Sequence, residues 1–451
     1  MNNSLSSAVG ATRVRYSILG MLCMLAMITY MDRAMYGSAR GDMMKAVGQP
    51  IENFYVVLIA FQLAYALFEI PTGWMGDTYG PRTTLLRIVL WWSLFIGLTA
   101  FAGMHFSLFG AVLIGFTVLV VLQFFFGMGE AGAFPNITKS LYNWFPATQR
   151  GTAQGTIWLS ARFMGGLTPM IWVLLTEIAG FDWREVLWLF AGIAFLWCVV
   201  FYFWFTNKPS EHSWTNQQER DLIDAGQIHG SHSGIPWGKI LRSRNLGFIC
   251  LMYMVTNFNW YYLLYYMPGN LKNQFPGMRG TDGGKLLLAL IGGAPLLIGM
   301  VGCMLGGLLT DRYVRKTGDR KWGRRIFAMT GYGMAGICYL LATFLYGNFW
   351  PFAICIMFVG FFNDLMMGSA WATCQDVGRR YAAIVSGCMN MIGNLGAALG
   401  IFVTGEILKH YKDDKATGEI TCFTLYAIVY GVGVLLWLKI DASKPIVEEA
   451  A

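Results

Sequence analysis

Four charged residues lie inside long apolar segments of this 451-residue chain. Asp32 and Arg33 are adjacent in "TYMDRAMYGS", Glu130 lies in "QFFFGMGEAGAFP", and Arg162 lies in "WLSARFMGG". A charge at the centre of a bilayer costs roughly 3 kcal/mol, so such charges usually face a polar cavity and mark the path of an ion or substrate. They predict an ion- or anion-binding site inside a membrane. The alternative for the first pair is a position near the membrane surface.

Two of these residues are carboxylic acids that could carry a proton. A carboxyl group in a low-dielectric environment favours its neutral form. Because Arg33 directly follows Asp32 and should stabilise its charge, the sequence favours Glu130 as the main proton carrier, with Asp32 as its partner. Adjacent side chains on a helix point about 100° apart, so Asp32 and Arg33 are expected to face different partners. The alternative is that Glu130 has only a structural role, with its carboxylate capped by neighbouring groups of the protein.

The two arginines could hold an anion, because a guanidinium group binds a carboxylate through two parallel hydrogen bonds. We expect Arg162, together with Arg33, to bind the substrate anion. Gln123 lies two helical turns before Glu130 and therefore shares its face. The alternative is an ion pair of Arg162 with Glu130 or Asp32 that only braces the helices.

The elements that position these residues are apolar segments long enough to cross a membrane. The chain is 56% hydrophobic and 13% charged, whereas a soluble domain carries about 25% charged residues. A span needs about 20 mainly apolar residues. Twelve candidate helices are predicted, near 16–38, 53–75, 84–104, 108–135, 151–178, 184–206, 245–267, 284–309, 325–346, 350–373, 380–407 and 420–440.

The polar segments predict the domain organisation and the orientation. The halves are expected at 1–206 and 245–451, joined by a linker at 207–244 with a short amphipathic helix near 215–226. Most of the 33 Lys and Arg residues fall in loops on one side if both termini are cytoplasmic, as the positive-inside rule requires. The net charge of +8 thus belongs to loops facing a lipid bilayer, and no nucleic acid partner is expected.

Other classes of chemistry lack a signal in the sequence. The nine Cys are scattered singly and not spaced for zinc or haem, so neither a metal nor a cofactor is expected. No Walker loop is present, which excludes ATP as the predicted energy source. Because no catalytic Ser/His cluster is evident, an enzyme is not expected.

The two halves repeat a loop motif that resembles the major facilitator superfamily. "GWMGDTYGPRTTLLR" follows the second segment and "GGLLTDRYVRKTGDRKWGRR" follows the eighth. The matching residues are Gly73, Asp77, Gly80 and Arg82 in the first copy and Gly307, Asp311 and Arg312 in the second. Thr78 replaces the usual Arg of the family. Both acidic residues are expected at cytoplasmic helix ends, where they hold one face closed and so act in gating.

More narrowly, the chain resembles the anion:cation symporter family, which includes bacterial galactonate, glucarate and hexuronate carriers, sialin and vesicular glutamate transporters. The residues that carry this resemblance are "YMDRA", "FQLAYALFEIPTGWMGD", "GMGEAGAFPNITKSLYNWFPATQRGTA", "KPSEHSW" and "SGCMNMIGNLGAALG". It implies an all-α membrane protein of twelve helices in two pseudo-symmetric halves. In the family, positions matching Asp32 and Arg33 couple protons and contact the carboxylate of the substrate.

Further site residues follow from the resemblance or from spacing. Tyr30, Tyr65, Trp371 and Asn394 match family positions near the substrate, and Asn390 lies one turn before Asn394. Spacing also places Tyr261 on one face with Asn257 and Tyr265, although an interfacial aromatic belt explains this stretch equally well. Asp364 is a further acid in an apolar segment to which no role is assigned.

Two departures from the family concern the anion. Relatives often have Arg at the position of Gln123, and galactonate-type carriers have Gln at the position of Arg162. Compared with these carriers, this chain has the positive charge in the fifth predicted span instead of the fourth.

The sequence therefore predicts a monomeric secondary transporter of a bacterial inner membrane. Protons would drive inward symport of an organic monoanion, such as a sugar acid, by alternating access. The alternatives are an anion exchanger or uniporter, and a non-transporting sensor on the same fold.

Overall fold

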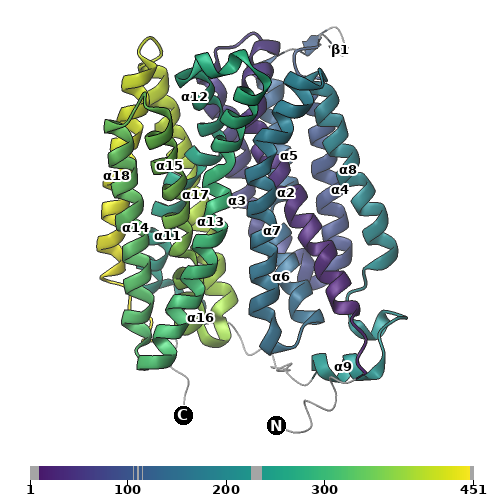
Figure 1. The fold of residues 1–451 in the computed structure, drawn as a ribbon. Coiled ribbons are helices and arrows are strands. Elements are labelled where there is room, and N and C mark those ends of the chain that lie inside the picture. Colours follow the sequence, from purple (N-terminus) through teal and green to yellow (C-terminus); the bar gives the residue numbers. More distant parts are fainter. Residues whose placement is uncertain (1–9, 105, 109–110, 114, 225–235, 447–451) are drawn as a thin grey trace.

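The computed structural model describes residues 10–104, 106–108, 111–113, 115–224 and 236–446. Its helices form two groups that stand side by side, the first from the N-terminal part of the chain and the second from the C-terminal part (Figure 1). The described part of the chain begins and finishes at the same end of the molecule, which we call the terminal face. The end that carries α12 (Met267–Gln274) is the distal face.

The N-terminal group contains α2 (Val14–Ala46), η1 (Ile51–Asn53), α3 (Phe54–Tyr79), α4 (Pro81–Thr99), α5 (Phe116–Glu130), α6 (Ala133–Trp144), α7 (Ala147–Val173), η2 (Leu174–Ile178) and α8 (Trp183–Trp204). The C-terminal group contains α11 (Arg244–Tyr265), α12, η4 (Pro276–Gly280), α13 (Asp282–Thr317), α14 (Arg320–Phe344), α15 (Phe349–Leu365), α16 (Met367–Gly378), η5 (Arg379–Tyr381), α17 (Ala382–His410) and α18 (Lys415–Trp437). The linker contains η3 (Pro209–Glu211), α9 (Gln217–Asp224) and α10 (Trp237–Leu241).

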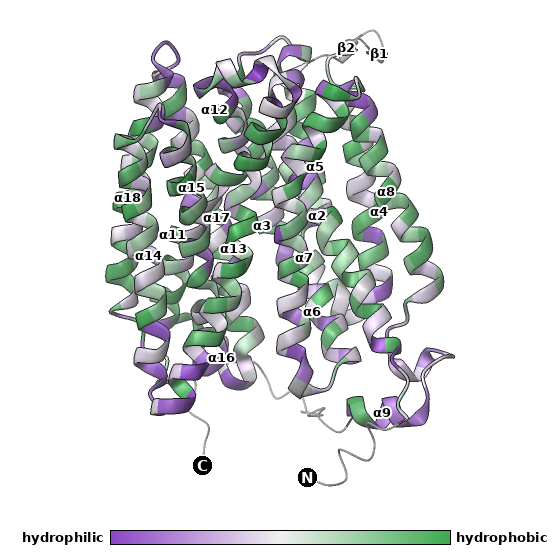
Figure 2. Cartoon of the chain, in the orientation of Figure 1, coloured by the Kyte–Doolittle hydropathy of each residue, from purple (hydrophilic) through white to green (hydrophobic). Residues whose placement is uncertain are grey.

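Ten helical segments within the described residues are long and apolar enough to cross a membrane. The other two expected spans correspond to α4, which carries Arg82 and Arg87, and to α11, which is rich in Tyr and Asn. Hydrophobic residues fill the central part of both groups and hydrophilic residues gather at the two ends (Figure 2). Large apolar side chains such as Phe203 and Phe344 are highly exposed, as expected of helices surrounded by lipid.

The expected start of the fourth span at residue 108 is wrong. The apolar residues there form a short antiparallel hairpin of β1 (Phe106–Leu108) and β2 (Ala111–Leu113), the only strands among the described residues, and α5 begins at Phe116. Gly115 separates the hairpin from the helix with a φ of +94°, a conformation that favours glycine. Hydrophobicity alone could not distinguish a strand from a helix over so short a run.

The two groups meet along two pairs of helices, α7 with α13 and α3 with α17. The first pair crosses very closely, because a Cβ atom on Gly293 would lie 1.7 Å from the carbonyl oxygen of Gly166. Small residues at such crossings let helix backbones approach each other in lipid. These crossings hold the two groups together near the middle of the molecule.

Polar contacts also join the groups at the distal face. Lys272 of α12 lies 2.5 Å from the carboxylate of Glu177, and Arg40 of α2 donates a hydrogen bond of 2.7 Å to Asn270. Tyr55 of α3 donates a hydrogen bond to Glu406 of α17. The ribbons of the two groups lie close together at this end and farther apart near α6 and α16 (Figure 1). The distal face is therefore the side at which the groups are tied together.

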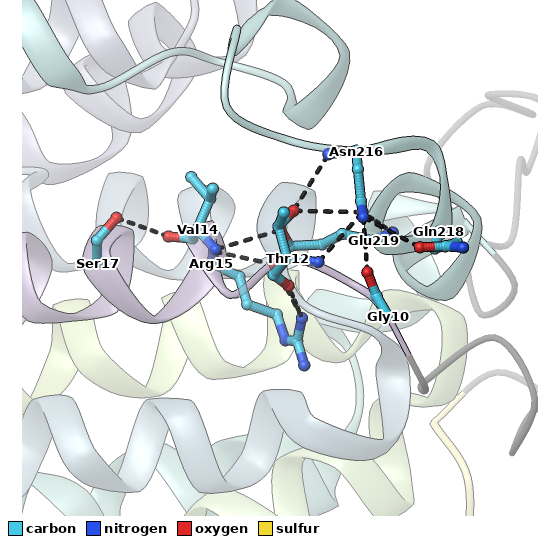
Figure 3. Close-up of polar contacts among 8 residues, drawn as sticks. All are labelled: Gly10, Thr12, Val14, Arg15, Ser17, Asn216, Gln218 and Glu219. Atoms are coloured by element: carbon cyan, nitrogen blue, oxygen red, sulfur yellow. Dashed lines mark hydrogen bonds and ion pairs between the residues drawn. The ribbon is translucent and has the colours of Figure 1, made fainter.

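The expected amphipathic helix near 215–226 is present as α9, and it holds the start of α2 (Figure 3). The buried carboxylate of Glu219 accepts hydrogen bonds from the backbone N–H groups of Val14 and Arg15 and from the hydroxyl of Thr12. It also forms an ion pair of 2.8 Å with the Arg15 side chain. A carboxylate at a helix N-terminus satisfies free amide groups and interacts favourably with the helix dipole. The linker thus caps the first membrane helix.

A second contact docks the linker on the same helices. His212 is buried between the rings of Trp144 and Trp204, with ring centroids 5.8 and 5.2 Å away. Its Nδ1 accepts a hydrogen bond from the backbone N–H of Trp214. Burial lowers the pKa of the His212 imidazole, so the docked linker favours the neutral ring.

Candidate functional site

Arg33 and Glu130 form a buried ion pair within the N-terminal group. Arg33 on α2 lies with its Nε 2.5 Å from Oε1 of Glu130, at the end of α5. Both side chains are almost completely inaccessible. The sequence predicts that Arg33 stabilises the charge of Asp32, but its guanidinium group contacts Glu130 instead. The two neighbours on α2 do face different partners, as helical geometry predicts.

Asp32 is a buried acid without a partner. Its exposed fraction is 1%, and neither carboxylate oxygen has a hydrogen-bond partner among the described residues. An isolated ionised carboxylate in a low-dielectric environment is very unfavourable, and burial of this group is tolerable only if it is neutral or if a ligand or ion satisfies it. Asp32 therefore needs a proton, an ion or a ligand to compensate its charge.

Arg162 is held by Asp364, which lies on the other helical group. Its Nε is 3.0 Å from Oδ2 of Asp364, and its Nη2 donates a hydrogen bond of 3.2 Å to Oδ1. The guanidinium group also lies 3.9 Å from the ring centre of Trp260 on α11. An ion pair for Arg162 was one of the predicted alternatives, but its partner is neither Glu130 nor Asp32. The structure thus gives Asp364 a partner.

The two paired carboxylates occupy similar positions in the two groups. Glu130 ends α5, and the chain then breaks at Gly132, whose φ of +82° is left-handed. Asp364 is the penultimate residue of α15, which is separated from α16 at Met366. Each break sits in the middle of a span, so each places a carboxylate deep in the molecule. Gly299 leaves room for Asp364, since a Cβ there would lie 2.7 Å from Oδ2.

Aromatic residues connect the two ion pairs. The ring centre of Tyr30 lies 5.8 Å from Cζ of Arg33 and 5.6 Å from Cζ of Arg162. Its hydroxyl accepts a hydrogen bond of 3.4 Å from Arg162. Tyr65 lies under Arg33, with 4.6 Å between Cζ and the ring centre. Tyr30 therefore lies near both cations.

Tyr261 and Tyr265 are buried and stacked on each other, with 5.4 Å between ring centroids. This position excludes the alternative of an aromatic belt at the membrane surface for these two side chains.

The predicted amides bind a third buried acid instead of standing free. Asn390 and Asn394 on α17 both donate hydrogen bonds to the carboxylate of Glu69 on α3. Gln62 on α3 donates a further hydrogen bond of 2.8 Å to Asn394. This network crosses between the two groups. Its members are suited to the hydroxyl groups of a ligand, but in this structure they satisfy one another.

Trp371 and Gln123 lie at the edges of this centre. Trp371 on α16 packs its ring 6.2 Å from that of Trp158 and 6.1 Å from that of Tyr253, and its indole N–H is buried without a partner among the described residues. Gln123 is buried on α5, and its amide nitrogen is likewise unpartnered. Both side chains retain hydrogen-bond donors that a ligand could use.

The expected gating residues differ between the two groups. In the C-terminal group, Asp311 forms an ion pair of 2.9 Å with Arg324, which also binds Asp376 at 2.9 Å. Arg312, the expected basic partner, is exposed and has no ion pair within the part of the chain that the structure describes. Gly307 packs against α16, because a Cβ on Gly368 would lie 2.7 Å from its nitrogen.

In the N-terminal group, Arg82 binds the carbonyl oxygen of Tyr202 at the end of α8, and its backbone N–H binds Asn207. The close helix approach occurs at Gly76, beside Asn136, whereas a Cβ on Gly73 would meet nothing. The side chain of Asp77 lies outside what the structure describes.

Sequence reasoning missed several partners in these networks. Glu69 is visible as a charge within an apolar segment, "YALFEIP", but it is not among the predicted site residues. Arg324 is contained in the basic loop motif, where its spacing did not distinguish it from its neighbours. Trp260 gave no signal, because it is one of many aromatic residues in α11.

One buried ion pair joins the two helical groups and another lies within the first group. Such buried charges between two helical halves are typical of helical membrane carriers with a central polar site. The model of the Major Facilitator Superfamily matches residues 22–401, and the chain belongs to this family. Its multiple apolar helices and its bacterial relatives are consistent with a multi-pass protein of the inner membrane.

Relatives match over nearly the whole chain. A probable sulfoacetate transporter of Cupriavidus necator is 30% identical over 95% of this chain and 94% of its own length. A probable galactarate/D-glucarate transporter of Escherichia coli K12 is 28% identical over 97% of this chain and 96% of its own. A bacterial homologue of the lysosomal transporter Spinster, solved in an inward-facing, unoccupied conformation, shares the fold with a TM-score of 0.70 and 14% identity, covering 96% of this chain and 99% of that one.

Proposed function

We propose that this protein imports a small organic acid together with protons, by alternating access of one central site. Its relatives are named as transporters of sulfoacetate, galactarate or D-glucarate, and D-galactonate. The observation that carries the proposal is the unpartnered, buried Asp32 next to the Arg33–Glu130 ion pair. An anion that binds Arg33 competes with the carboxylate of Glu130, which then favours binding a proton, and Asp32 is a second buried acid that is suited to hold one.

The charges of the centre support proton coupling. Two guanidinium groups, those of Arg33 and Arg162, lie among four buried acids, Asp32, Glu69, Glu130 and Asp364. Adding an anion to such a site without protons would leave several uncompensated charges in a low-dielectric environment, which is strongly unfavourable. Proton binding at Asp32 and Glu130 offsets this cost. The arginines then contact the anion, and the tyrosines and amides contact its neutral groups.

The contacts between the groups support a gating scheme. Lys272–Glu177, Arg40–Asn270 and Tyr55–Glu406 close the distal face, and the positive-inside rule assigns the terminal face to the cytoplasm. The arrangement described is then a carrier closed to the outside. For the carrier to open to the outside again, these three contacts would have to break while contacts form at the terminal face, where Asp311 and Arg324 lie.

Uptake into proteoliposomes tests the proposal. Purified protein is reconstituted, and uptake of sulfoacetate, D-glucarate and D-galactonate is measured with and without an acid-outside pH gradient. We expect accumulation that the gradient stimulates and that a protonophore abolishes.

Two other results would point to other functions. Uptake only when substrate is preloaded inside the vesicles identifies an exchanger. Binding without uptake identifies a sensor, and an absence of both binding and uptake rejects anion transport.

A further inference from the structure

The two cations of the centre share one aromatic side chain. Cζ of Arg33 lies 5.8 Å and Cζ of Arg162 lies 5.6 Å from the ring centre of Tyr30. Their separation cannot exceed the sum of these two distances. A ligand lying beside Tyr30 is therefore within reach of both guanidinium groups at once.

Each cation already has a carboxylate of the protein as its partner. Glu130 occupies Arg33 through a contact to Nε, and Asp364 occupies Arg162 through contacts to Nε and Nη2. The two carboxylates come from different helical groups and lie at the breaks in α5 and α15. The centre thus contains two carboxylates bound to two cations, and both cations lie near the ring of Tyr30.

From this arrangement we infer that the transported substrate is a short dianion, with one anionic group for each arginine. This inference rests on the proposed anion transport and narrows its substrate class, and it replaces the monoanion expected from the sequence. The anionic ends of the ligand take the places of Glu130 and Asp364 on the guanidinium groups. Each displaced carboxylate then takes up a proton, Asp364 as well as Glu130, so that no uncompensated charge remains. A monoanion would fill one of these places and leave the second cation with its internal partner.

The size of the ligand follows from the same distances. A hydrogen-bonded guanidinium–carboxylate contact places the carboxyl carbon ~4 Å from Cζ. Two such contacts take up most of the greatest possible separation of the two Cζ atoms. What remains is at most about 3.4 Å. It fits anionic groups joined by one or two carbon atoms, such as a sulfonate and a carboxylate on one methylene group. A six-carbon dicarboxylate would have to bind in a bent form.

Matched ligands test the number of charges. Sulfoacetate is compared with isethionate, in which a hydroxymethyl group replaces the carboxylate, and with glycolate, in which a hydroxyl group replaces the sulfonate. Binding is measured by competition against labelled sulfoacetate in proteoliposomes. We expect sulfoacetate to bind at least about tenfold more tightly than either monoanion, since a hydrogen-bonded charge pair contributes roughly one tenfold factor or more. Equal affinities would overturn the inference.

Variants of the two arginines test whether each of them binds one anionic group of the ligand. Arg162→Gln and Arg33→Gln should each reduce the preference for sulfoacetate over the monoanions to about twofold or less. Arg325→Gln is the matched control, since Arg325 is a buried arginine near the start of α14 that binds the backbone carbonyl oxygens of Leu438 and Ile440. This control should keep the preference. A preference that survives in both site variants would count against the assignment.

Two further results separate the possible failures. If the arginine variants do not fold, a structure of the wild-type protein with sulfoacetate decides, because persistence of both internal ion pairs contradicts the inference. If wild-type protein takes up monoanions as well as dianions, the dianion inference fails while anion transport stands. If it takes up none of the three ligands or the sugar acids, the proposed function itself fails.

Discussion

At the scale of single residues, Asp32 makes the clearest prediction. Because it is the buried acid without a partner, Asp32→Asn should remove a proton site without breaking an ion pair. We expect uptake driven by the pH gradient to fall more than tenfold, while exchange of internal for external substrate persists. Both are measured in proteoliposomes. Asp42→Asn, which changes an exposed acid on the same helix, is the control and should leave gradient-driven uptake intact.

Residue types were predictable from the sequence, but their partners were not. A charge within an apolar run is conspicuous whatever the fold, and this identified Asp32, Arg33, Glu130 and Arg162. Partner choice depends on how helices are rotated and on which distant helix lies opposite. Arg162 and Asp364 are 202 positions apart and belong to different halves, so no local spacing could pair them.

At the scale of elements, the crossing of α7 and α13 depends on two glycines. Gly293→Ala would place a Cβ against the backbone of Gly166, which cannot move aside as a flexible side chain could. We expect the thermal unfolding midpoint of detergent-solubilised protein to fall by several degrees and transport to be lost. Gly283→Ala on the same helix meets open space and should change neither. An unchanged midpoint for Gly293→Ala would mean that the helices separate at no cost.

The docked linker makes a second prediction at this scale. The folded protein favours neutral His212, so the interaction stabilises docking at a pH above the pKa of the free side chain, about 6.5, and this contribution is lost as the pH falls below it. Amide hydrogen exchange of residues 209–224 should therefore accelerate, after correction for the intrinsic rate, between pH 7.5 and pH 5.5. His212→Gln should show little of this dependence. A linker equally protected at both pH values would contradict the prediction.

Elements were predicted well where hydrophobicity extended over a whole span. It predicted the ten helical segments that are long and apolar enough to cross a membrane, and the short helix α9. It failed at Leu108 and at Ala111–Leu113, which lie in β-strands, and it could not indicate the breaks that divide the fourth and tenth spans. Such breaks depend on a local backbone conformation, as at Gly132, and leave the average hydropathy of the span unchanged.

At the scale of the whole molecule, the ties across the distal face should control which side is open. Lys272→Glu would set two like charges opposite each other at Glu177 and favour opening of that face. The reporter is Ser38→Cys in a background without the nine native Cys, because Ser38 lines a cavity of about 480 Å³ at this face. We expect faster labelling by a membrane-impermeant maleimide. The charge-swapped double variant, Lys272→Glu with Glu177→Lys, should restore the slow labelling rate. If Lys272→Glu is labelled no faster than the protein with Lys272, this ion pair does not control which side is open.

The cap that α9 places on α2 has a consequence for dividing the protein into separately expressed pieces. A first piece ending at residue 206 would lack Glu219, and the opening turn of its first helix would lose the acceptor for two backbone amides (Figure 3). A piece ending at residue 224 would retain that acceptor. When each is produced together with a fragment starting at residue 236, the longer one should reassemble into a working carrier more efficiently.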